Sequence, residues 1–501
     1  MTLVHKELIR SDRALVPGDD GFRFSHILIR DAAYDSLTKR LRAELHERFA
    51  DWVEARLGSG SLDEIVGYHL EQAYRYRVEL GSEDEHARTL ARKAGCLLAE
   101  AGRRAQERSD TAATCSLLGR AIDLLQDGDP KLSSLLIALG SATFDAGKVP
   151  SALELLCRAQ SAAAAAGQRG IQLRARMNEL YILLFGDPGQ QTGAALAEAE
   201  TAITELQQHD DLEALASAWG VVAQVGNMRI DDLLWTKGAR HALEWARRAG
   251  SRREVADATR TLIAALTYGA TPVDEAISQA EQALADFPEE RPGEVLLAML
   301  YAFAGHIQEA ETAIERHRRS LLELGHRMQY ARYAMHVGWI ALVADRPERA
   351  EHELREGAEL LEAAGERSWL STVAAVLAEV LYRLGRNDEA EEWTEKSERA
   401  ASPEDALSQA LWRSTRAKVI ARRSAAERAT RLSAEAVEQA RRCDNLHLLG
   451  DCLSDRAEVL RLLNRADEAR PFLQEALVAY TRKGIVPLIE RTRVSLAENP
   501  A

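Results

Sequence analysis

The clearest pattern in the chain is a short polar turn that ends in alanine and recurs between runs of apolar residues. The segment Ala-Gly-His-Ile-Gln-Glu-Ala closes at Ala310, and similar segments close at Ala350, Ala390, Ala429 and Ala469. The steps between these alanines are 40, 40, 39 and 40 residues. Such a period is typical of stacked helical hairpins, because one hairpin cannot bury its apolar side without a neighbour. The pattern therefore predicts a solenoid of two-helix repeats.

Small residues at two further positions of the repeat support this alignment. One position lies 12 residues before the closing alanine, and it holds Gly140, Ala264, Ala298, Gly338, Ala378, Ala417 and Ala457. The other lies seven residues after it, where His317 is the exception, and holds Ala159, Ala283, Gly357, Ser397, Ala436 and Ala476. Small side chains at fixed places on both helices let the two backbones approach where they cross. Upstream, the register continues through Ala276, Ala239, Ala194 and Ala152.

These features resemble tetratricopeptide repeats in their longer form of about 40 residues. The predicted fold is all-α: a right-handed superhelical solenoid of tetratricopeptide-like hairpins over residues 106–496. Each repeat is expected to hold a first helix, a turn such as Gly385–Asp388, and a second helix that begins near Glu389. We expect Asn387 or Asp388 to cap the exposed amide groups of that second helix.

The first 58 residues follow a different pattern. Two short alternating runs, Glu7–Arg10 and Phe22–Ser25, flank the turn-forming residues 17–21 and predict a β-hairpin. Helices are expected from His26 to Trp52. Residues 59–105 are then expected to form a helical linker, which a flexible Gly-Ser joint at 58–61 introduces.

Several segments resemble a family of bacterial signalling ATPases, the STAND type. They are Phe22–Tyr34, Arg42–His46, Gly67–Tyr74 and Leu411–Lys418. In that family a nucleotide-binding module is followed by a winged-helix domain and a tetratricopeptide arm, and one version carries a class III adenylate or guanylate cyclase domain in front. The resemblance implies that residues 1–58 are a winged-helix remnant. It also implies that the repeats are a sensor arm.

The catalytic parts of that family have no counterpart in the sequence. There is no Gly-x-x-x-x-Gly-Lys-[Ser/Thr] segment to cradle phosphates, and no cyclase sequence. We therefore expect a non-catalytic interaction and sensing scaffold in signal transduction, with no catalytic residue and no cofactor. Two alternatives stay open: a fragment of a full-length ATP-binding adenylate or guanylate cyclase, or a winged-helix transcriptional regulator.

The first 30 or so residues carry apolar side chains that a truncated winged helix would leave uncovered. These are Leu3, Leu8, Ile9, Phe22 and Phe24. We expect this region to be loosely held or buried by a partner chain.

Composition and charge limit the classes of partner that the chain is expected to bind. The net charge of −14 repels phosphate backbones, which argues against nucleic acid as a partner. No apolar run of about 18 residues is present, so no membrane span is expected. The five cysteines form no Cys-x-x-Cys pair, and no His-Glu-x-x-His spacing occurs, so no metal site is predicted. Cysteines in helical stretches indicate a reducing compartment, and a cytoplasmic location is expected.

One helix stands out as a candidate binding surface. In this architecture the first helix of each hairpin lines the concave side, and residues 327–344 are unusually aromatic and cationic. The candidate partner-binding residues are Arg327, Tyr330, Arg332, Tyr333, His336 and Trp339. Aromatic and arginine side chains supply much of the energy of protein interfaces. The expected partner is a protein or peptide, with a small-molecule inducer as a second candidate. The competing interpretation is that Tyr333 and Trp339 pack against the adjoining hairpin.

Overall fold

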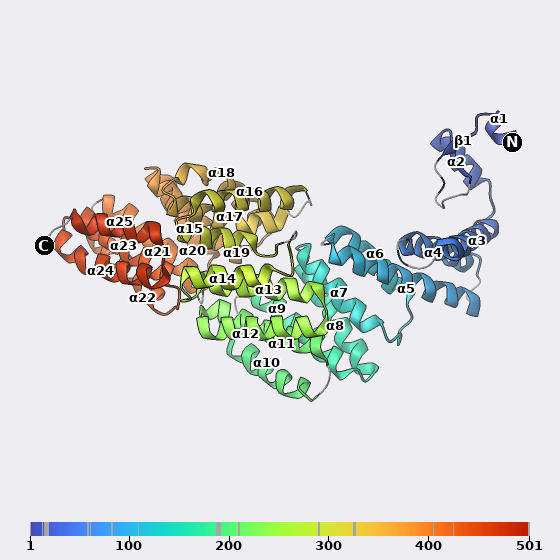
Figure 1. Ribbon diagram of the computed structural model, residues 1–501, viewed down its shortest axis with the longest axis horizontal. Coiled ribbons are helices and arrows are strands. Elements are labelled where there is room, and N and C mark those ends of the chain that lie inside the picture. The colour runs from blue at the N-terminus through green and yellow to red at the C-terminus, as the bar shows by residue number, and fades with distance from the viewer. Residues whose placement is uncertain are drawn as a thin grey trace. The chain divides into compact units, whose positions relative to one another are not determined.

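The computed structural model describes residues 2–498 except 13, 15–19, 58–59, 61, 82–83, 109, 187–191, 209–210, 289–290, 324–326, 404 and 424. Within these residues the chain forms 25 α-helices and one two-stranded sheet (Figure 1). The predicted all-α class is therefore confirmed. The chain divides into two compact units, Met1–Gln172 (unit 1) and Leu173–Ala501 (unit 2). The domain boundaries predicted at 58 and 105 stay predictions.

Unit 1 begins with the predicted hairpin. Strands β1 (Ile9–Asp12) and β2 (Gly21–Phe24) pair antiparallel, with Ile9 opposite Phe24. Most of the turn between them, and most of the Gly-Ser joint at 58–61, lie outside the described residues. The helices of this part of the chain are α1 (Thr2–His5), α2 (Ile27–Asp35), α3 (Lys39–Leu57), α4 (Asp63–Glu79), α5 (Glu85–Glu107), α6 (Thr111–Leu124), α7 (Leu132–Asp145), α8 (Val149–Ala165) and α9 (Arg169–Gly186), in which the division between the units falls.

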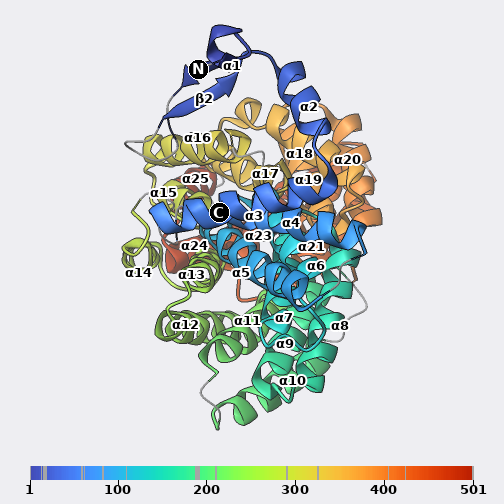
Figure 2. The same cartoon turned by 90° about the vertical axis from the view of Figure 1, so that its right-hand side faces the viewer.

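Unit 2 is built from consecutive hairpins that pack in succession (Figures 1 and 2). Its further helices are α10 (Thr192–Leu206), α11 (Leu212–Arg229), α12 (Asp232–Ala249), α13 (Arg252–Tyr268), α14 (Val273–Leu284), α15 (Glu294–Phe303), α16 (Ile307–Glu323), α17 (Arg327–Val343), η1 (Pro347–Arg349), α18 (Glu351–Ala363), α19 (Arg367–Arg383), α20 (Asn387–Ala400), α21 (Ala406–Arg422), α22 (Ala426–Arg441), α23 (Leu446–Leu462), α24 (Ala466–Lys483) and α25 (Val486–Ala497). From α13 to α23, each odd-numbered helix contacts the next odd-numbered helix as well as its own hairpin partner. These first helices therefore form one continuous inner row.

The repeat signature marks buried contacts. The closing residues Ala310, Ala350, Ala390 and Ala429 are all 0% exposed. Upstream the predicted register is wrong by one residue, because Ala194 is exposed and Ala195 is the buried residue at that place. The signature predicts the hairpins because each closing alanine lies where a larger side chain would have no room.

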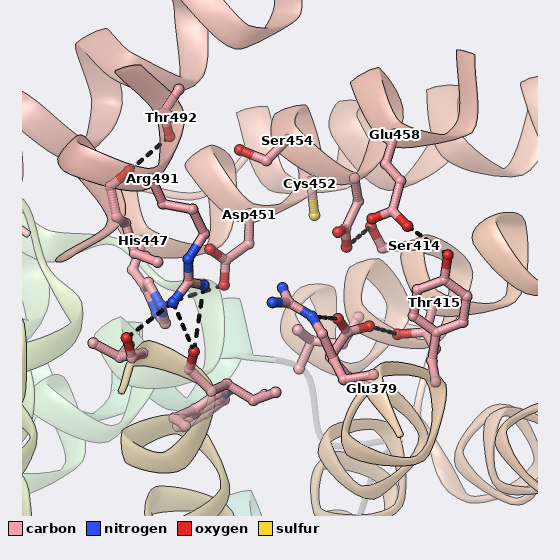
Figure 3. A pocket seen from close by; sticks show the side chains of 18 of the residues that line it. Glu379, Ser414, Thr415, His447, Asp451, Cys452, Ser454, Glu458, Arg491 and Thr492 are labelled. Atoms are coloured by element: carbon pink, nitrogen blue, oxygen red, sulfur yellow. Dashed lines mark hydrogen bonds and ion pairs between the residues drawn. The ribbon is translucent and has the colours of Figure 1, made fainter. Parts of the chain in front are cut away.

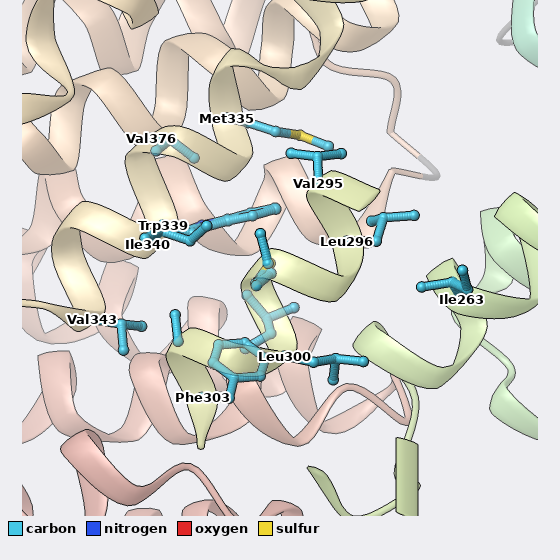
Figure 4. Packing of buried hydrophobic residues seen from close by; sticks show 14 of the residues in the cluster. Ile263, Val295, Leu296, Leu300, Phe303, Met335, Trp339, Ile340, Val343 and Val376 are labelled. Atoms are coloured by element: carbon cyan, nitrogen blue, oxygen red, sulfur yellow. The ribbon is translucent and has the colours of Figure 1, made fainter. Parts of the chain in front are cut away.

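The small residues stand where two helices touch. A Cβ atom added at Gly338 would meet Val376 Cγ1 at 2.5 Å, and one added at Gly357 would meet the Ala334 Cβ at 2.7 Å. Neither distance is compatible with normal packing, so the prediction of close helix crossings is confirmed. Larger apolar residues, among them Val295, Met335 and Trp339, fill the space around these crossings (Figure 4).

The predicted cap of the second helix is wrong. Helix α20 begins at Asn387, two residues earlier than expected, and the residue before it, Arg386, provides no side-chain cap. Gly385 has a φ of 79°, which turns the chain sharply and brings the helix start forward. Asp388 and Glu389 then lie in the first turn, where their charges favour the positive end of the helix dipole.

A buried lysine ties the end of the array to an earlier hairpin. Lys483, at the end of α24, is 1% exposed and its Nζ donates to the carbonyl oxygens of Leu266 (2.8 Å), Gly269 (2.6 Å) and Thr271 (2.8 Å). Leu266 lies 217 residues earlier in the sequence. Burial lowers the pKa of Lys483 to about 7. Three acceptors match the three donors of an ammonium group, so Lys483 caps the carboxyl end of α13.

The amino-terminal segment lacks such cover. Leu3 is 53% exposed, Phe22 54% and Leu28 67%, and α2 has no buried residue. Leu8 and Ile9 are half-buried. Across the described part of the chain, no helix combines the length and apolar character needed to cross a membrane.

Candidate functional site

The inner row of unit 2 borders an open cavity of about 680 Å³. Its wall is made by the first helices of four successive hairpins, α17, α19, α21 and α23, together with α24 and the final helix α25. Side chains from all of these helices reach it. Figure 3 labels those from α19, α21, α23 and α25. The polar and aromatic members of the lining are Trp339, Glu379, Tyr382, Arg383, Ser414, Thr415, Arg422, His447, Asp451, Ser454, Asp455, Glu458, Arg461, Tyr480, Arg491, Thr492 and Ser495.

A buried lysine organises the floor of this cavity. Lys418 on α21 is 0% exposed, and its Nζ donates to Glu379 Oε1 (2.8 Å), Glu379 Oε2 (2.7 Å) and Asp455 Oδ1 (2.6 Å). Thr415 Oγ1 donates to Glu379 (2.9 Å) and Ser414 Oγ to Asp455 (2.8 Å). The lysine thus links the first helices of three hairpins, α19, α21 and α23.

The three charges shift one another's pKa. Burial raises the pKa of Glu379, but Lys418 and Arg383 outweigh burial and bring that pKa to about 2. For Asp455, burial dominates and raises the pKa to about 7. Burial opposes the charge of Lys418, yet Asp455 and Glu379 together raise its pKa. Lys418 is therefore held in its charged form by two acidic groups, and burial favours the protonated form of Asp455 more than that of Glu379.

Two further acidic groups on α23 lie closer to the open space. Glu458 accepts a hydrogen bond from the Tyr382 hydroxyl, to which Arg422 Nε also donates at 2.9 Å. Asp451 accepts from the Tyr480 hydroxyl at 2.7 Å, and His447 Nε2 lies 3.3 Å from its other oxygen. The side chains of Glu458 and Asp451 are 35% and 32% exposed. Each acid is thus fixed in place by a tyrosine while one side still faces the cavity.

Arginines occupy the same wall. Arg491 on α25 donates to the carbonyl oxygens of Leu342 (3.4 Å) and Val343 (3.1 Å), at the end of α17 (Figure 3). Arg383 Nε donates to Glu379 at 2.9 Å. Arg461 is exposed, one turn beyond Glu458 on α23. The cavity therefore offers cationic hydrogen-bond donors and anionic acceptors. The aromatic rings of Trp339, Tyr382 and Tyr480 lie beside them.

One register position could have revealed this site from the sequence. The residue that follows the small residue of each first helix is Trp339, Glu379, Lys418 and Glu458 in four successive repeats. The structure places all four at the cavity, with Lys418 beneath its surface. Sequence reasoning missed Glu379, Lys418 and Glu458 because it sought an aromatic helix. Charged residues directly beside a packing glycine or alanine were the available signal.

The six residues predicted to bind a partner do not form one surface. Trp339 belongs to the cavity lining, and the other five do not. Tyr330 is buried with its hydroxyl 2.9 Å from Glu356 Oε2, and His336 is 1% exposed. Arg332 and Tyr333 are half-buried, and Arg327 is exposed. Their role in partner binding stays a prediction.

Buried aromatic and histidine side chains surround this helix. The Tyr268 hydroxyl lies 2.5 Å from His336 Nε2, and the rings of His317 and Tyr333 meet edge to face at 5.4 Å. Burial lowers the pKa of His336 to about 3 and that of His317 to about 4. These histidines are therefore neutral at physiological pH and act as packing groups with hydrogen-bonding edges.

The cavity lining includes one cysteine, Cys452. Its side chain is 0% exposed, and burial raises its pKa well above the ordinary value. A protonated thiol is a poor nucleophile, so Cys452 itself is not poised to attack a ligand. No cluster of three or more histidine, cysteine, aspartate or glutamate side chains in the described ranges has the arrangement of a metal site.

Comparison with known proteins identifies the class of fold. No protein-family model and no curated protein matches the chain. Among solved structures, it is similar to a Rap protein complexed with competence and sporulation factor, at a TM-score of 0.53 and 13% identity, over 74% of this chain and 99% of that one. The Cut9–Hcn1 hetero-tetramer of APC/C (TM-score 0.39, 13% identity, covering 93% and 92%) and yeast Tom70 (0.34, 12%, covering 92% and 97%) are more distant. The likeness to Rap shows that the chain has a tetratricopeptide-type helical-repeat fold.

Proposed function

We propose that this chain is a non-catalytic interaction and sensing scaffold in signal transduction, and that the cavity of unit 2 binds a short peptide segment of its partner. The observation that carries the proposal is the register of Trp339, Glu379, Lys418 and Glu458 along the inner row. A solenoid needs apolar or small residues there for packing. Three of these repeats instead direct an aromatic or charged group at one cavity, and the fourth places Lys418 beneath its surface.

The size and chemistry of the cavity fit a peptide. A volume of about 680 Å³ lies within the range of ligand sites, roughly 300–1,000 Å³. Carboxylates, guanidinium groups and hydroxyls at fixed positions can pair with the amide groups and charged ends of an extended segment, while Trp339 and Tyr382 offer apolar contact. The Rap protein, which has a similar fold, was solved with competence and sporulation factor. A small-molecule inducer is the alternative occupant.

The wider role rests on the resemblance of Phe22–Tyr34 and Gly67–Tyr74 to STAND-type ATPases. In this proposal the repeats are the sensor arm of such a regulator, and ligand binding changes the populations of two arrangements of the hairpins. Small rotations distributed over many hairpins make such a change physically accessible.

A selection from a random heptapeptide library tests the proposal. Full-length protein is immobilised and compared with Arg461→Glu, which reverses a charge at the cavity without touching the core. Arg482→Glu is the matched control, because Arg482 is exposed on α24 and lies outside the cavity lining. We expect the wild type and Arg482→Glu to enrich the same peptides and Arg461→Glu to lose them. Enrichment of the same peptides by all three proteins, or of none by the wild type, would contradict the proposal.

A further inference from the structure

Two arginines of the cavity wall approach the same carboxylate from different helices. Arg383 Nη1 on α19 lies 3.9 Å from Asp345 Oδ1, and Arg491 Nη2 on α25 lies 3.8 Å from that same oxygen. Both distances are too long for a hydrogen bond. The side chain of Asp345 is 71% exposed, so solvent screens both ion pairs. The two guanidinium groups therefore meet around an anion that neither of them holds firmly.

Asp345 is unusual among its equivalents in the repeats. It follows α17 with a φ of 58°, in the left-handed region. The residues at this place in other repeats are Gly305 (φ 87°), Gly385 (φ 79°) and Asn464 (φ 60°). Glycine is the usual residue for this backbone conformation, and asparagine and aspartate also adopt it. The turn itself does not require a carboxylate, so the charge of Asp345 is available to the two arginines.

Arg383 stands at a register position that is not reserved for apolar packing. Other repeats have Phe303, Val343 and Leu462 there, and the next repeat has a second arginine, Arg422, which also lines the cavity. Arg383 donates its Nε–H to Glu379, and Arg491 uses its Nη groups on the carbonyl oxygens of Leu342 and Val343. A guanidinium group has five N–H donors, so each arginine keeps donors for a further acceptor.

We propose that the space between Arg383 and Arg491 is an oxyanion subsite of the cavity, which binds a carboxylate or phosphate group of the ligand in place of Asp345. This inference rests on the proposed peptide binding and adds the chemistry of one end of the ligand. The planar fork of a guanidinium group matches a two-oxygen acceptor, so an anion between the two arginines can form the short bonds that Asp345 does not.

The acidic groups nearby are already engaged. Asp451, which faces Arg491, accepts from the Tyr480 hydroxyl at 2.7 Å and has His447 at 3.3 Å. Glu379, next to Arg383, is held by Lys418. Lys418 therefore offsets the charge of Glu379, whereas the hydrogen bond from Tyr480 holds Asp451 in place. Asp345 remains as the exposed, loosely held carboxylate that an incoming anion can displace.

Anion binding at the subsite also affects a contact between two helices, α17 and α25. Arg491 caps the last carbonyl groups of α17 from α25, which lies at the other end of the cavity wall. An anion that draws Arg491 toward Arg383 weakens this cap, so α17 and α25 respond to the ligand together.

The test is calorimetric titration of full-length protein at low ionic strength with three probes: trialanine with a free carboxylate, trialanine amide, and inorganic phosphate. The variants are Arg383→Gln and Asp345→Asn. Asparagine suits the left-handed backbone, as Asn464 shows, so Asp345→Asn removes the charge without straining the turn. Arg441→Gln and Asp388→Asn are the matched controls, because both residues form surface ion pairs outside the cavity lining.

The predicted responses have opposite signs. Arg383→Gln should weaken anion binding at least about tenfold, through loss of a charge-assisted hydrogen bond. Asp345→Asn should tighten it about three- to tenfold, because it removes an internal competitor. A response to trialanine but not to its amide identifies a carboxylate as the occupant, and a response to phosphate alone identifies a phosphate group.

Other results would overturn the inference. Equal affinity for trialanine and its amide without phosphate binding, an unchanged affinity in Asp345→Asn, or no binding of any probe would each do so. A purely structural role of Arg383 predicts no tightening in Asp345→Asn. If the peptide selection succeeds while these titrations fail, the subsite is wrong and the proposed function stands. If the titrations succeed while Arg461→Glu leaves the peptide selection unchanged, the anion subsite stands and the proposed peptide binding is wrong.

Discussion

The amino-terminal segment and the hairpins of unit 2 carry similar apolar residues, but these residues are exposed in the first and buried in the second. Leu28 on α2 is 67% exposed, whereas Leu453 on α23 is 0% exposed. Both lie on helices, so helical structure alone does not bury a leucine. In unit 2 each first helix packs against its own partner and against the next first helix. Burial in this chain is therefore supplied by neighbouring repeats, and the segment before the repeats does not receive it.

The largest effect is expected at Lys418. Lys418→Met leaves Glu379 and Asp455 facing each other in a buried site, and breaking a buried ion pair costs about 3–5 kcal/mol. Urea unfolding followed by tryptophan fluorescence measures the loss. Asp455→Asn is the contrast: burial raises the pKa of this carboxyl, and Lys418 keeps Glu379 as a partner, so an uncharged amide should replace Asp455 with a smaller loss. Equal losses in the two variants would contradict the assigned charges.

Leucine truncation tests the comparison itself. Leu453→Ala should lower the free energy of unfolding by about 2–5 kcal/mol, since it leaves a cavity in a packed core. Leu28→Ala should change it by less than about 0.5 kcal/mol, as at other exposed positions. The same urea experiment measures both. A cost at Leu28 that matches the cost at Leu453 would show that the amino-terminal segment is covered after all.

Two glycines of α11 extend the comparison between packed and unpacked positions to the addition of a single methyl group. A Cβ atom at Gly226 would meet the Trp235 Cα at 2.6 Å, so Gly226→Ala should destabilise the protein by about 1–3 kcal/mol. A Cβ atom at Gly220 meets nothing within 4 Å, so Gly220→Ala should stabilise it by about 0.5–1 kcal/mol. Thermal unfolding distinguishes them by sign. A stabilising Gly226→Ala would show that α11 and α12 do not cross there.

Acid should destabilise unit 2 through its buried histidines. The pKa is lowered to about 3 for His336 and about 4 for His317, against about 6.5 in the unfolded chain. Below pH 6.5 the unfolded state therefore binds protons that the folded state does not, and stability falls as the pH falls toward 4. The expected slope is on the order of 1 kcal/mol per pH unit for each histidine. His336→Gln should flatten it, and a slope unchanged by this substitution would refute the assignment.

The sequence predicted the repeats better than the cavity, because packing residues recur in every hairpin and cavity residues do not. Closing alanines such as Ala350 and packing glycines such as Gly338 are local requirements of every hairpin, so they recur and can be counted. In the Lys418 site a cation from one repeat pairs with acids from the repeats on either side. No recurring residue reveals it, because the register position beside the packing glycine or alanine holds a different residue in successive repeats, Trp339, Glu379 and Lys418.

The aromatic helix shows the opposite difficulty. Tyr330, His336 and Trp339 are the residue types of a binding surface, yet packing between hairpins uses the same types, and Tyr330 and His336 are buried. Only Trp339 of these reaches the cavity lining. Composition on one helix cannot separate the two uses, because the separation depends on how far the next first helix covers it.

Site-directed photo-crosslinking tests the central claim, that the inner row of unit 2 is a ligand-binding site, most directly. A photoreactive amino acid is placed at Ser454, which lines the cavity, or at Val478, which is 66% exposed on the outer helix α24 of the same hairpin. Each full-length protein is irradiated with the random heptapeptide library and examined by mass spectrometry. The account predicts peptide adducts at position 454 and none at 478. Equal labelling of both positions, or no labelling at 454, would contradict it.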